Sequence, residues 1–196
     1  FGFSLMMVMR WQMAFPDQAV PIIGGFIKWL AELNGFASDG NLPADLYNVF
    51  GAMHGTIMIF LGVVPLVVGA FGNYVVPLQI GAPDMAFPKL NMTSYWVYFI
   101  GGIIMLVSFL LPGGAANSGW TSYPPLSVIA TTGQTFWLIG MVFLITSSLL
   151  GSINIIVTII QLRAPGLTWM RLPFFVWAQF VTSFLLVLAF PPLEAA

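Results

Sequence analysis

Four long apolar stretches that carry almost no charge dominate the sequence. They lie at residues 49–71, 94–111, 135–160 and 172–193. An α-helix that rises 1.5 Å per residue needs roughly 20 apolar residues to cross a hydrocarbon core about 30 Å thick. With 59% hydrophobic and only 6% charged residues, the chain also lies far outside the composition of soluble domains. The sequence therefore predicts an all-α, polytopic transmembrane helix bundle with four complete spans.

A fifth apolar stretch, residues 1–9, has only about half the length of a span and stops at Arg10. It has neither the basic start nor the small-residue cleavage site of a signal peptide. We interpret it as the end of a further helix. The last span in turn finishes at Pro191, Pro192 and Glu194. We therefore expect a partial bundle, with residues 1–196 forming a single membrane domain that is a fragment of a longer subunit.

The segment from residue 15 to residue 46 carries four of the six acidic residues and many turn formers, which predicts a long aqueous loop. Within it, residues 26–33 suit either a short interfacial helix or ordinary loop packing. Lys89, Arg163 and Arg171 lie on the same side of the bundle as Asp84. Because basic loops stay on the cytoplasmic side, we expect the Asp84 side to be cytoplasmic.

Composition also excludes several classes of function. The net charge of −1 provides no basic face for nucleic acid. The chain has no cysteine and one histidine, so disulfides, thiolate ligands and a metal cage built from histidines are excluded. Any metal must arrive in a cofactor that brings most of its own ligands, or be completed by ligands from elsewhere.

The single histidine, His54, lies inside the first complete span. A metal-ligating side chain at that depth marks a candidate functional site. Met58 shares its helix face, while Gly51 and Gly55 remove side chains nearby. A glycine-lined surface beside an imidazole suits a haem. Close helix packing at the glycines, with His54 hydrogen-bonded to a neighbouring helix, explains the same pattern.

A second polar set begins where that span ends. Asp84 lies in a turn between Pro83 and Pro88, and a carboxylate at a membrane mouth can collect protons. Amides and hydroxyls that can order water towards the interior are Asn73, Asn91, Ser94, Thr146, Ser147, Ser148, Ser152 and Asn154. The alternative role of these groups is to hydrogen-bond one helix to another. Their combination with Asp84 favours a proton route.

Four motifs, in order along the chain, closely resemble subunit I of the heme-copper oxidases, and in particular its bacterial cytochrome c oxidase branch. They are YNVFGAMHGTIMIF from residue 47, GNYVVPLQIGAPDMAFPKLN followed by SYW from residue 72, GWTSYPPLS from residue 119 and SSLLGSIN from residue 147. The resemblance implies that the chain covers the N-terminal portion of that subunit, from the end of helix I through helix V.

The resemblance also implies residue roles. His54 resembles an axial ligand of a low-spin haem, of the heme a type, whose second imidazole comes from a later helix. Arg10, Tyr47 and Trp120 resemble residues placed around that haem, with Met58 on the His54 face; without the resemblance, Tyr47 and Trp120 suit interfacial anchoring. Asp84 resembles the entry carboxylate of a proton-uptake channel. The remaining channel residues are Asn73, Asn91, Ser94, Ser147, Ser148 and Asn154, with Met92 where a second asparagine is often found.

The implied whole is the catalytic subunit of a proton-pumping terminal oxidase of the bacterial inner membrane. Its high-spin haem and copper would be held by residues outside this chain. Its partners would be other oxidase subunits, cytochrome c or another electron donor, and the rest of subunit I or a companion chain. Two other hypotheses remain: a redox-free proton or ion transporter in which His54 and Asp84 relay protons, and a split or structural subunit without activity alone. The Asp84 motif disfavours a nitric oxide reductase.

Overall fold

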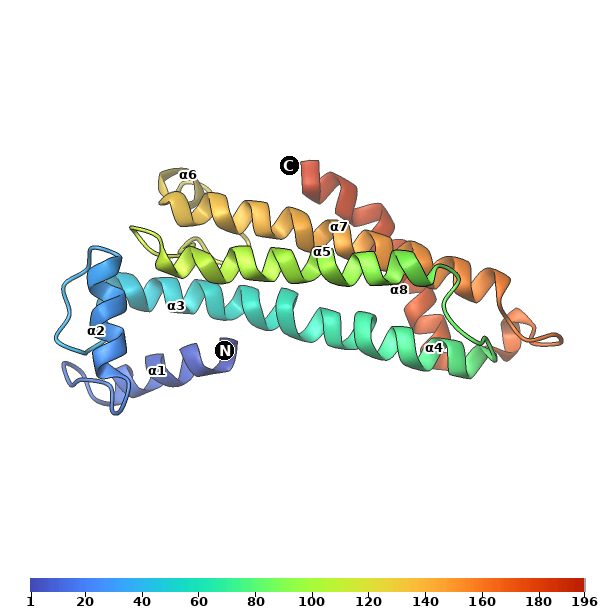
Figure 1. Cartoon of the computed structure of the whole chain (residues 1–196), viewed down its shortest axis with the longest axis horizontal. Coiled ribbons are helices and arrows are strands. Elements are labelled where there is room, and N and C mark those ends of the chain that lie inside the picture. The colour runs from blue at the N-terminus through green and yellow to red at the C-terminus, as the bar shows by residue number, and fades with distance from the viewer. Residues whose placement is uncertain (196) are drawn as a thin grey trace. The chain divides into compact units, whose positions relative to one another are not determined.

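Helices form every regular element of the computed structural model, which describes residues 1–195, and no strand occurs in that range. The predicted all-α fold is confirmed. Internal contacts divide the chain into two compact units. The first unit comprises Phe1–Gly62 and Gly102–Gly140, and the second comprises Val63–Gly101 together with the described residues from Met141 onward. Figure 1 shows helices α1 to α8 in chain order. The single membrane domain stays a prediction.

Four helical stretches are long and apolar enough to cross a membrane, as predicted, which is typical of a multi-pass membrane protein. They are Ala44–Ile80, Pro88–Leu110, Thr132–Gln161 and Phe174–Ala195. The first is longer than the apolar stretch that predicted it. It begins at Ala44, after Pro43, and Asp45 in its first turn complements the positive end of the helix dipole. His54 therefore lies ten residues beyond the helix start, about 15 Å along the axis.

In the first unit, α1 (Gly2–Ala14) packs against α3 (Ala44–Thr56). The apolar stretch stops at Arg10, but the helix continues to Ala14 with the Arg10 side chain exposed. The loop between these helices contains α2 (Gly24–Leu33), which buries Ile27 and Leu30. Of the two alternatives for this segment, the helix is the one observed. The unit also holds a short 3-10 helix η3 (Ser108–Leu110), α6 (Leu126–Ile129) and the start of α7 (Thr132–Gln161).

The first span changes its helical winding directly after the histidine turn. After α3 the chain forms two π-helical segments, η1 (Ile57–Val63) and η2 (Pro65–Phe71), before α4 (Gly72–Ile80). π-Helical turns are rare and occur frequently at functional sites. Gly81 ends α4 in the left-handed conformation, with φ of 73°, which glycine adopts without a steric penalty. The chain can therefore turn sharply into the segment that carries Asp84.

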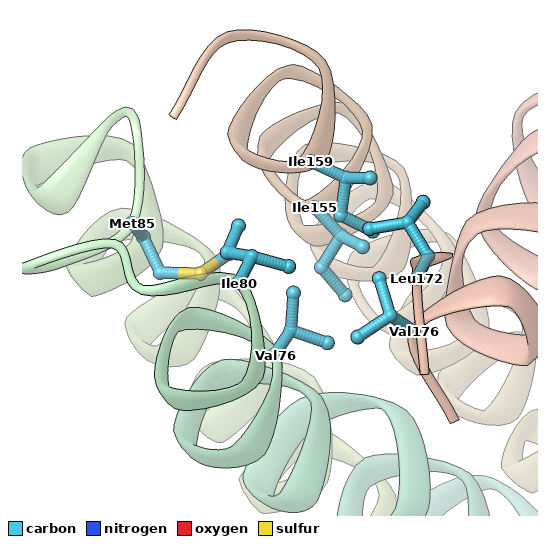
Figure 2. Close-up of a cluster of buried hydrophobic side chains, with 7 residues drawn as sticks. All are labelled: Val76, Ile80, Met85, Ile155, Ile159, Leu172 and Val176. Carbon is cyan, nitrogen blue, oxygen red and sulfur yellow. The ribbon is translucent and has the colours of Figure 1, made fainter. Parts of the chain in front are cut away.

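The second unit is held at one end by a cluster of buried apolar side chains (Figure 2). Its members come from α4, from the bend after α4, from α7, from the loop after α7 and from α8 (Phe174–Ala195): Val76, Ile80, Met85, Ile155, Ile159, Leu172 and Val176. The Ala164 N–H also donates to the Ile80 carbonyl at 2.9 Å. These contacts fix the end of α4 against α7 and α8, and so fix the bend that follows. α5 (Pro88–Val107) begins directly after that bend.

Candidate functional site

His54 is oriented by a backbone carbonyl from another helix. Its Nδ1 lies 2.7 Å from the carbonyl oxygen of Gly2 in α1. A carbonyl can only accept, so Nδ1 is the donor in this bond, and Nε2 is the ring nitrogen left for another partner. A Cβ on Gly2 would lie 2.9 Å from Ile57 Cγ2 and 3.1 Å from Met58 Sδ. The absence of a side chain at Gly2 is therefore what lets α1 approach the imidazole.

The donor arrangement at His54 fits a residue that holds the iron of a haem. Histidines that bind metals almost always donate the other ring N–H to a carbonyl, a carboxylate or water, which fixes the ring and raises its basicity. His54 is half-buried and makes this donation to Gly2. Among residues 1–195, no group of three or more His, Cys, Asp or Glu side chains could hold a metal ion. The donor set therefore suits an iron that arrives in a macrocycle rather than a bare ion.

The other predicted haem contacts lie in the same unit. Met58 lies beside Gly2, and a Cβ on Gly55 would lie 3.4 Å from Trp120 Cδ1. Trp120 is 49% exposed. Tyr47 donates its hydroxyl to Met13 Sδ at 3.2 Å, towards the far end of α1. The structure thus brings Met58 next to Gly2, the partner of His54, and Trp120 next to Gly55, the residue after His54. The Arg10 side chain is exposed on α1.

The contacts that position Trp120 and α3 were not predicted from the sequence. Gln134, only 5% exposed, accepts a hydrogen bond from Ser118 Oγ and donates to Ser122 Oγ at 2.8 Å. It thereby joins both sides of the loop that carries Trp120. Trp137 Nε1 donates to Thr56 Oγ1 at 3.1 Å. The sequence signal was weak, because a lone glutamine or threonine in an apolar helix has no spacing pattern that reveals its partner.

The second unit contains a cavity of about 670 Å³. Six of the seven predicted proton-channel residues line it, from α4, the bend, α5 and α7: Asn73, Asp84, Asn91, Ser94, Ser147 and Ser148. They span more than 70 positions of the sequence, so the fold brings together groups that are far apart along the chain. The remaining lining is mostly apolar, and its aromatic members are Tyr95 and Tyr98.

Asp84 is exposed at a bend, and its Oδ1 accepts the backbone N–H of Met85 at 2.7 Å. The residues after it are held from α7. The Ala86 N–H donates to Thr158 Oγ1 at 2.9 Å, and the Phe87 N–H donates to Asn154 Oδ1 at 2.9 Å. Together these bonds fix the position of the carboxylate at the cavity.

Asn154 is not among the residues that line the cavity. Its side chain is fully buried, and its Nδ2 donates back to the Phe87 carbonyl at 3.2 Å. Both ends of the amide are therefore used to hold the backbone after Asp84. The sequence pattern placed Asn154 on the water route, whereas its observed contacts are those of a residue that anchors the bend.

Inside the cavity, Ser147 Oγ donates to the Ser94 carbonyl at 2.6 Å, and Ser94 Oγ donates to the Asn91 carbonyl at 2.8 Å. Both hydroxyl oxygens keep lone pairs that can accept from water. Asn73 Oδ1 is buried and has no hydrogen-bond partner among residues 1–195. Buried polar atoms are nearly always paired, with ordered water where protein offers no donor. The cavity is therefore both roomy and polar enough to hold several waters.

The whole chain, residues 1–196, matches the family described as Cytochrome C and Quinol oxidase polypeptide I. It is 48% identical over 176 residues to cytochrome c oxidase subunit 1 of Thermostichus vulcanus, a match that covers 89% of this chain and 32% of that protein. It is 51% identical over 154 residues to cytochrome c oxidase subunit 1 of Bacillus sp. (strain PS3), covering 78% of this chain and 25% of that protein.

A third relative, the probable cytochrome c oxidase subunit 1-beta of Nocardia farcinica, is 48% identical over 158 residues, which cover 79% of this chain and 27% of that protein. The chain therefore spans between about a quarter and a third of the length of these curated relatives. The resemblance to oxidase subunit I that the motifs indicated is confirmed. The chain belongs to the family of cytochrome c and quinol oxidase polypeptide I.

Proposed function

We propose that this chain supplies part of the catalytic subunit of a proton-pumping terminal oxidase of the cytochrome c oxidase type. The observation that carries the proposal is the cavity of the second unit, where six polar side chains from separate segments meet. The chain belongs to a family of haem-containing oxidases, and its cavity can hold water. Together these two observations favour proton uptake coupled to electron transfer. In this proposal the chain provides one haem ligand and the entrance of the proton route.

His54 Nε2 would hold the iron of a low-spin haem of the heme a type. The hydrogen bond from Nδ1 to Gly2 fixes the rotation of the ring and strengthens it as a ligand. When bound, the haem supplies one-electron transfer. Arg10, Tyr47, Met58 and Trp120 would contact the macrocycle. His54 is the single histidine of this chain, so any further imidazole ligand would be supplied by another part of the complete enzyme.

Asp84 would exchange protons with bulk water at the mouth of the cavity. The backbone N–H groups of the residues that follow Asp84, Ala86 and Phe87, are held by Thr158 and Asn154, which fixes the bend that carries the carboxylate. Waters that accept from or donate to Asn73, Asn91, Ser94, Ser147 and Ser148 would carry the proton onward. A carboxylate is suited to the entrance because it both accepts and releases a proton, whereas an amide does neither.

The remaining assignments follow from the family. Lys89, Arg163 and Arg171 lie in or beside the loops at the Asp84 end of the second unit, and basic residues favour the cytoplasmic side. We therefore place Asp84 at the cytoplasmic face of a bacterial inner membrane. A high-spin haem and copper, other oxidase subunits, the rest of subunit I and an electron donor such as cytochrome c would complete the enzyme.

The test is Asp84→Asn in the complete enzyme, reconstituted in vesicles. Proton transfer by a positioned group is worth about 10²–10⁴-fold, so we expect turnover to fall at least about a hundredfold and proton release outside the vesicles to disappear. Asp39→Asn makes the same chemical change at an exposed residue of the first unit and is expected to pump normally. Normal pumping by Asp84→Asn would remove Asp84 from the route.

A further inference from the structure

Three buried side-chain oxygens on α7 and α8 have no hydrogen-bond partner among residues 1–195. They are Ser152 Oγ on α7, and Gln179 Oε1 and Ser183 Oγ on α8. Ser152 and Ser183 are fully buried, and Gln179 is only 4% exposed. Buried polar atoms are nearly always paired, with protein or with ordered water, so each of these atoms needs a partner. The proposed function gives none of the three residues a role.

The two serines differ from other buried hydroxyl groups in the spans. Thr158 Oγ1 donates to the carbonyl four residues earlier at 2.6 Å, and Ser108 Oγ donates to the carbonyl three residues earlier at 2.6 Å. Such a bond to the preceding turn commonly satisfies a hydroxyl inside a helix. Ser152 and Ser183 do not make it. Their hydroxyl groups are therefore available to a partner outside their own helices.

Gln179 is held at the junction of three segments of the second unit. Its Nε2 donates to the Val67 carbonyl in η2 at 3.2 Å, which leaves Oε1 as the unpaired end of the amide. A Cβ on Gly72 of α4 would lie 3.2 Å from Gln179 Oε1 and 3.3 Å from Ile155 Cδ1 of α7. Oε1 therefore lies where α4, α7 and α8 meet, and a side chain at Gly72 would cover it.

Both serines lie one helical turn from that junction. Ser152 precedes Ile155 by three residues on α7, and Ser183 follows Gln179 by four residues on α8, so each shares a helix face with a residue of the junction. Ile155 lies in the same buried cluster as Val176, three residues before Gln179 (Figure 2). The interface between α7 and α8 is thus apolar at the cluster and becomes polar one turn further along both helices.

The polar part of this interface borders the cavity of the second unit. Ser148, one turn before Ser152, lines the cavity from α7, and Leu186, three residues after Ser183, lines it from α8. Gly151 lines it as well, and a Cβ on Gly151 would meet no atom within 4 Å. Space that can hold water therefore reaches the residue next to Ser152.

We propose that Ser152, Gln179 and Ser183 form a binding site for ordered water between α7 and α8, which extends the hydrated cavity beyond its lining. A buried water makes about two to four hydrogen bonds, and the three groups supply partners in that number. Each serine hydroxyl both donates and accepts, and Gln179 Oε1 accepts, so both the hydrogens and the oxygen of a water find partners. The inference goes beyond the proposed function and does not depend on the roles of His54 or Asp84.

The direct test is a structure of the complete oxidase complex, determined by cryo-electron microscopy or crystallography at a resolution where ordered waters are visible. We expect a water peak within about 3.2 Å of at least two of the three oxygens. The same peak is expected in Asp84→Asn, because the site does not use that carboxylate, so loss of pumping in that variant tests the proposed function separately. The proposal is overturned if no water peak meets this condition, whether the side chains bond to protein atoms or to nothing.

A double-mutant cycle gives a second readout. Ser152→Ala and Ser183→Ala each remove one partner of the same water, so the two losses are coupled. We expect the double variant to lower the unfolding temperature by less than the sum of the two single variants. Ser108→Ala in the first unit is the matched control, since its hydroxyl is fully buried but bonds within its own span, and its effect should add to that of Ser152→Ala. Additive effects of Ser152→Ala and Ser183→Ala would contradict a shared water.

Discussion

A side chain at Gly2 should weaken the orientation of His54 by a calculable amount. The Cβ of Gly2→Ala would lie 2.9 Å from Ile57 Cγ2, and an ordinary contact begins at 3.4 Å. Relief therefore requires a movement of about 0.5 Å. If α1 moves away from α3 by that amount, the Nδ1 to oxygen distance grows from 2.7 Å to about 3.2 Å, the upper end of the range for N–H···O bonds. Gly2→Val, with two further carbons, would break the bond.

The energetic effect follows from the lost bond and the added crowding. A net hydrogen bond is worth about 0.5–1.5 kcal/mol, and an overpacked core costs typically about 1–3 kcal/mol. Because Ile57 Cγ2 and Met58 Sδ are the outer atoms of side chains, we expect Gly2→Ala at the low end, about 1 kcal/mol, and Gly2→Val well above it. The weaker donation by Nδ1 should also shift the absorption band of the low-spin haem.

The assay is thermal unfolding of the purified complex together with its reduced-minus-oxidised absorption spectrum. Gly25→Ala is the matched control, since a Cβ there meets nothing within 4 Å. Ile57→Ala removes the Cγ2 atom that the new Cβ meets, so the double variant Gly2→Ala with Ile57→Ala should recover the band position, a coupling that a double-mutant cycle measures. The reasoning is refuted if Gly2→Val matches the wild type in both unfolding temperature and spectrum.

Two further predictions concern the cavity. Thr158→Val leaves the Ala86 N–H without its acceptor, so it should lower the free energy of unfolding by about 1–3 kcal/mol and speed hydrogen exchange at that amide. Thr158→Ser should behave as the wild type. Mass spectrometry of exchanged peptides measures this difference, and equal exchange in both variants would contradict the anchoring role. Asn73→Leu removes the buried Oδ1 that has no protein partner, so it should slow proton uptake without lowering thermal stability; unchanged single-turnover proton uptake would show that no water on the route depends on Asn73.

The spans and the polar positions could be predicted because their signals are local. A run of about 20 apolar residues has few alternatives to a transmembrane helix. Asp84 lies between two prolines, which favour a turn whatever the neighbouring helices do. The motifs that resemble oxidase subunit I then indicated which polar residues belong together. Their convergence on one cavity agrees with that grouping.

The contacts that determine chemistry were not predictable in the same way. The partner of His54 is a backbone carbonyl 52 residues earlier, and every residue type has one, so no pattern marks it. The partner of Gln179 is likewise a backbone carbonyl, 112 residues earlier. The π-helical turns after α3 alter which side chains share a face, whereas the sequence pattern assumes a regular α-helix. Helix rotation, which decides that Asn154 faces Phe87 rather than the cavity, depends on packing.

The measurement that tests the central claim most directly is the reduced-minus-oxidised absorption spectrum of the complete complex carrying His54→Ala. If His54 ligates the low-spin haem, its six-coordinate signal disappears while the copper and the second haem, held by other residues, remain. Asn48→Ala, six residues earlier on the same helix, serves as the control and should keep the signal. A low-spin haem signal of normal position and intensity in His54→Ala would contradict the account.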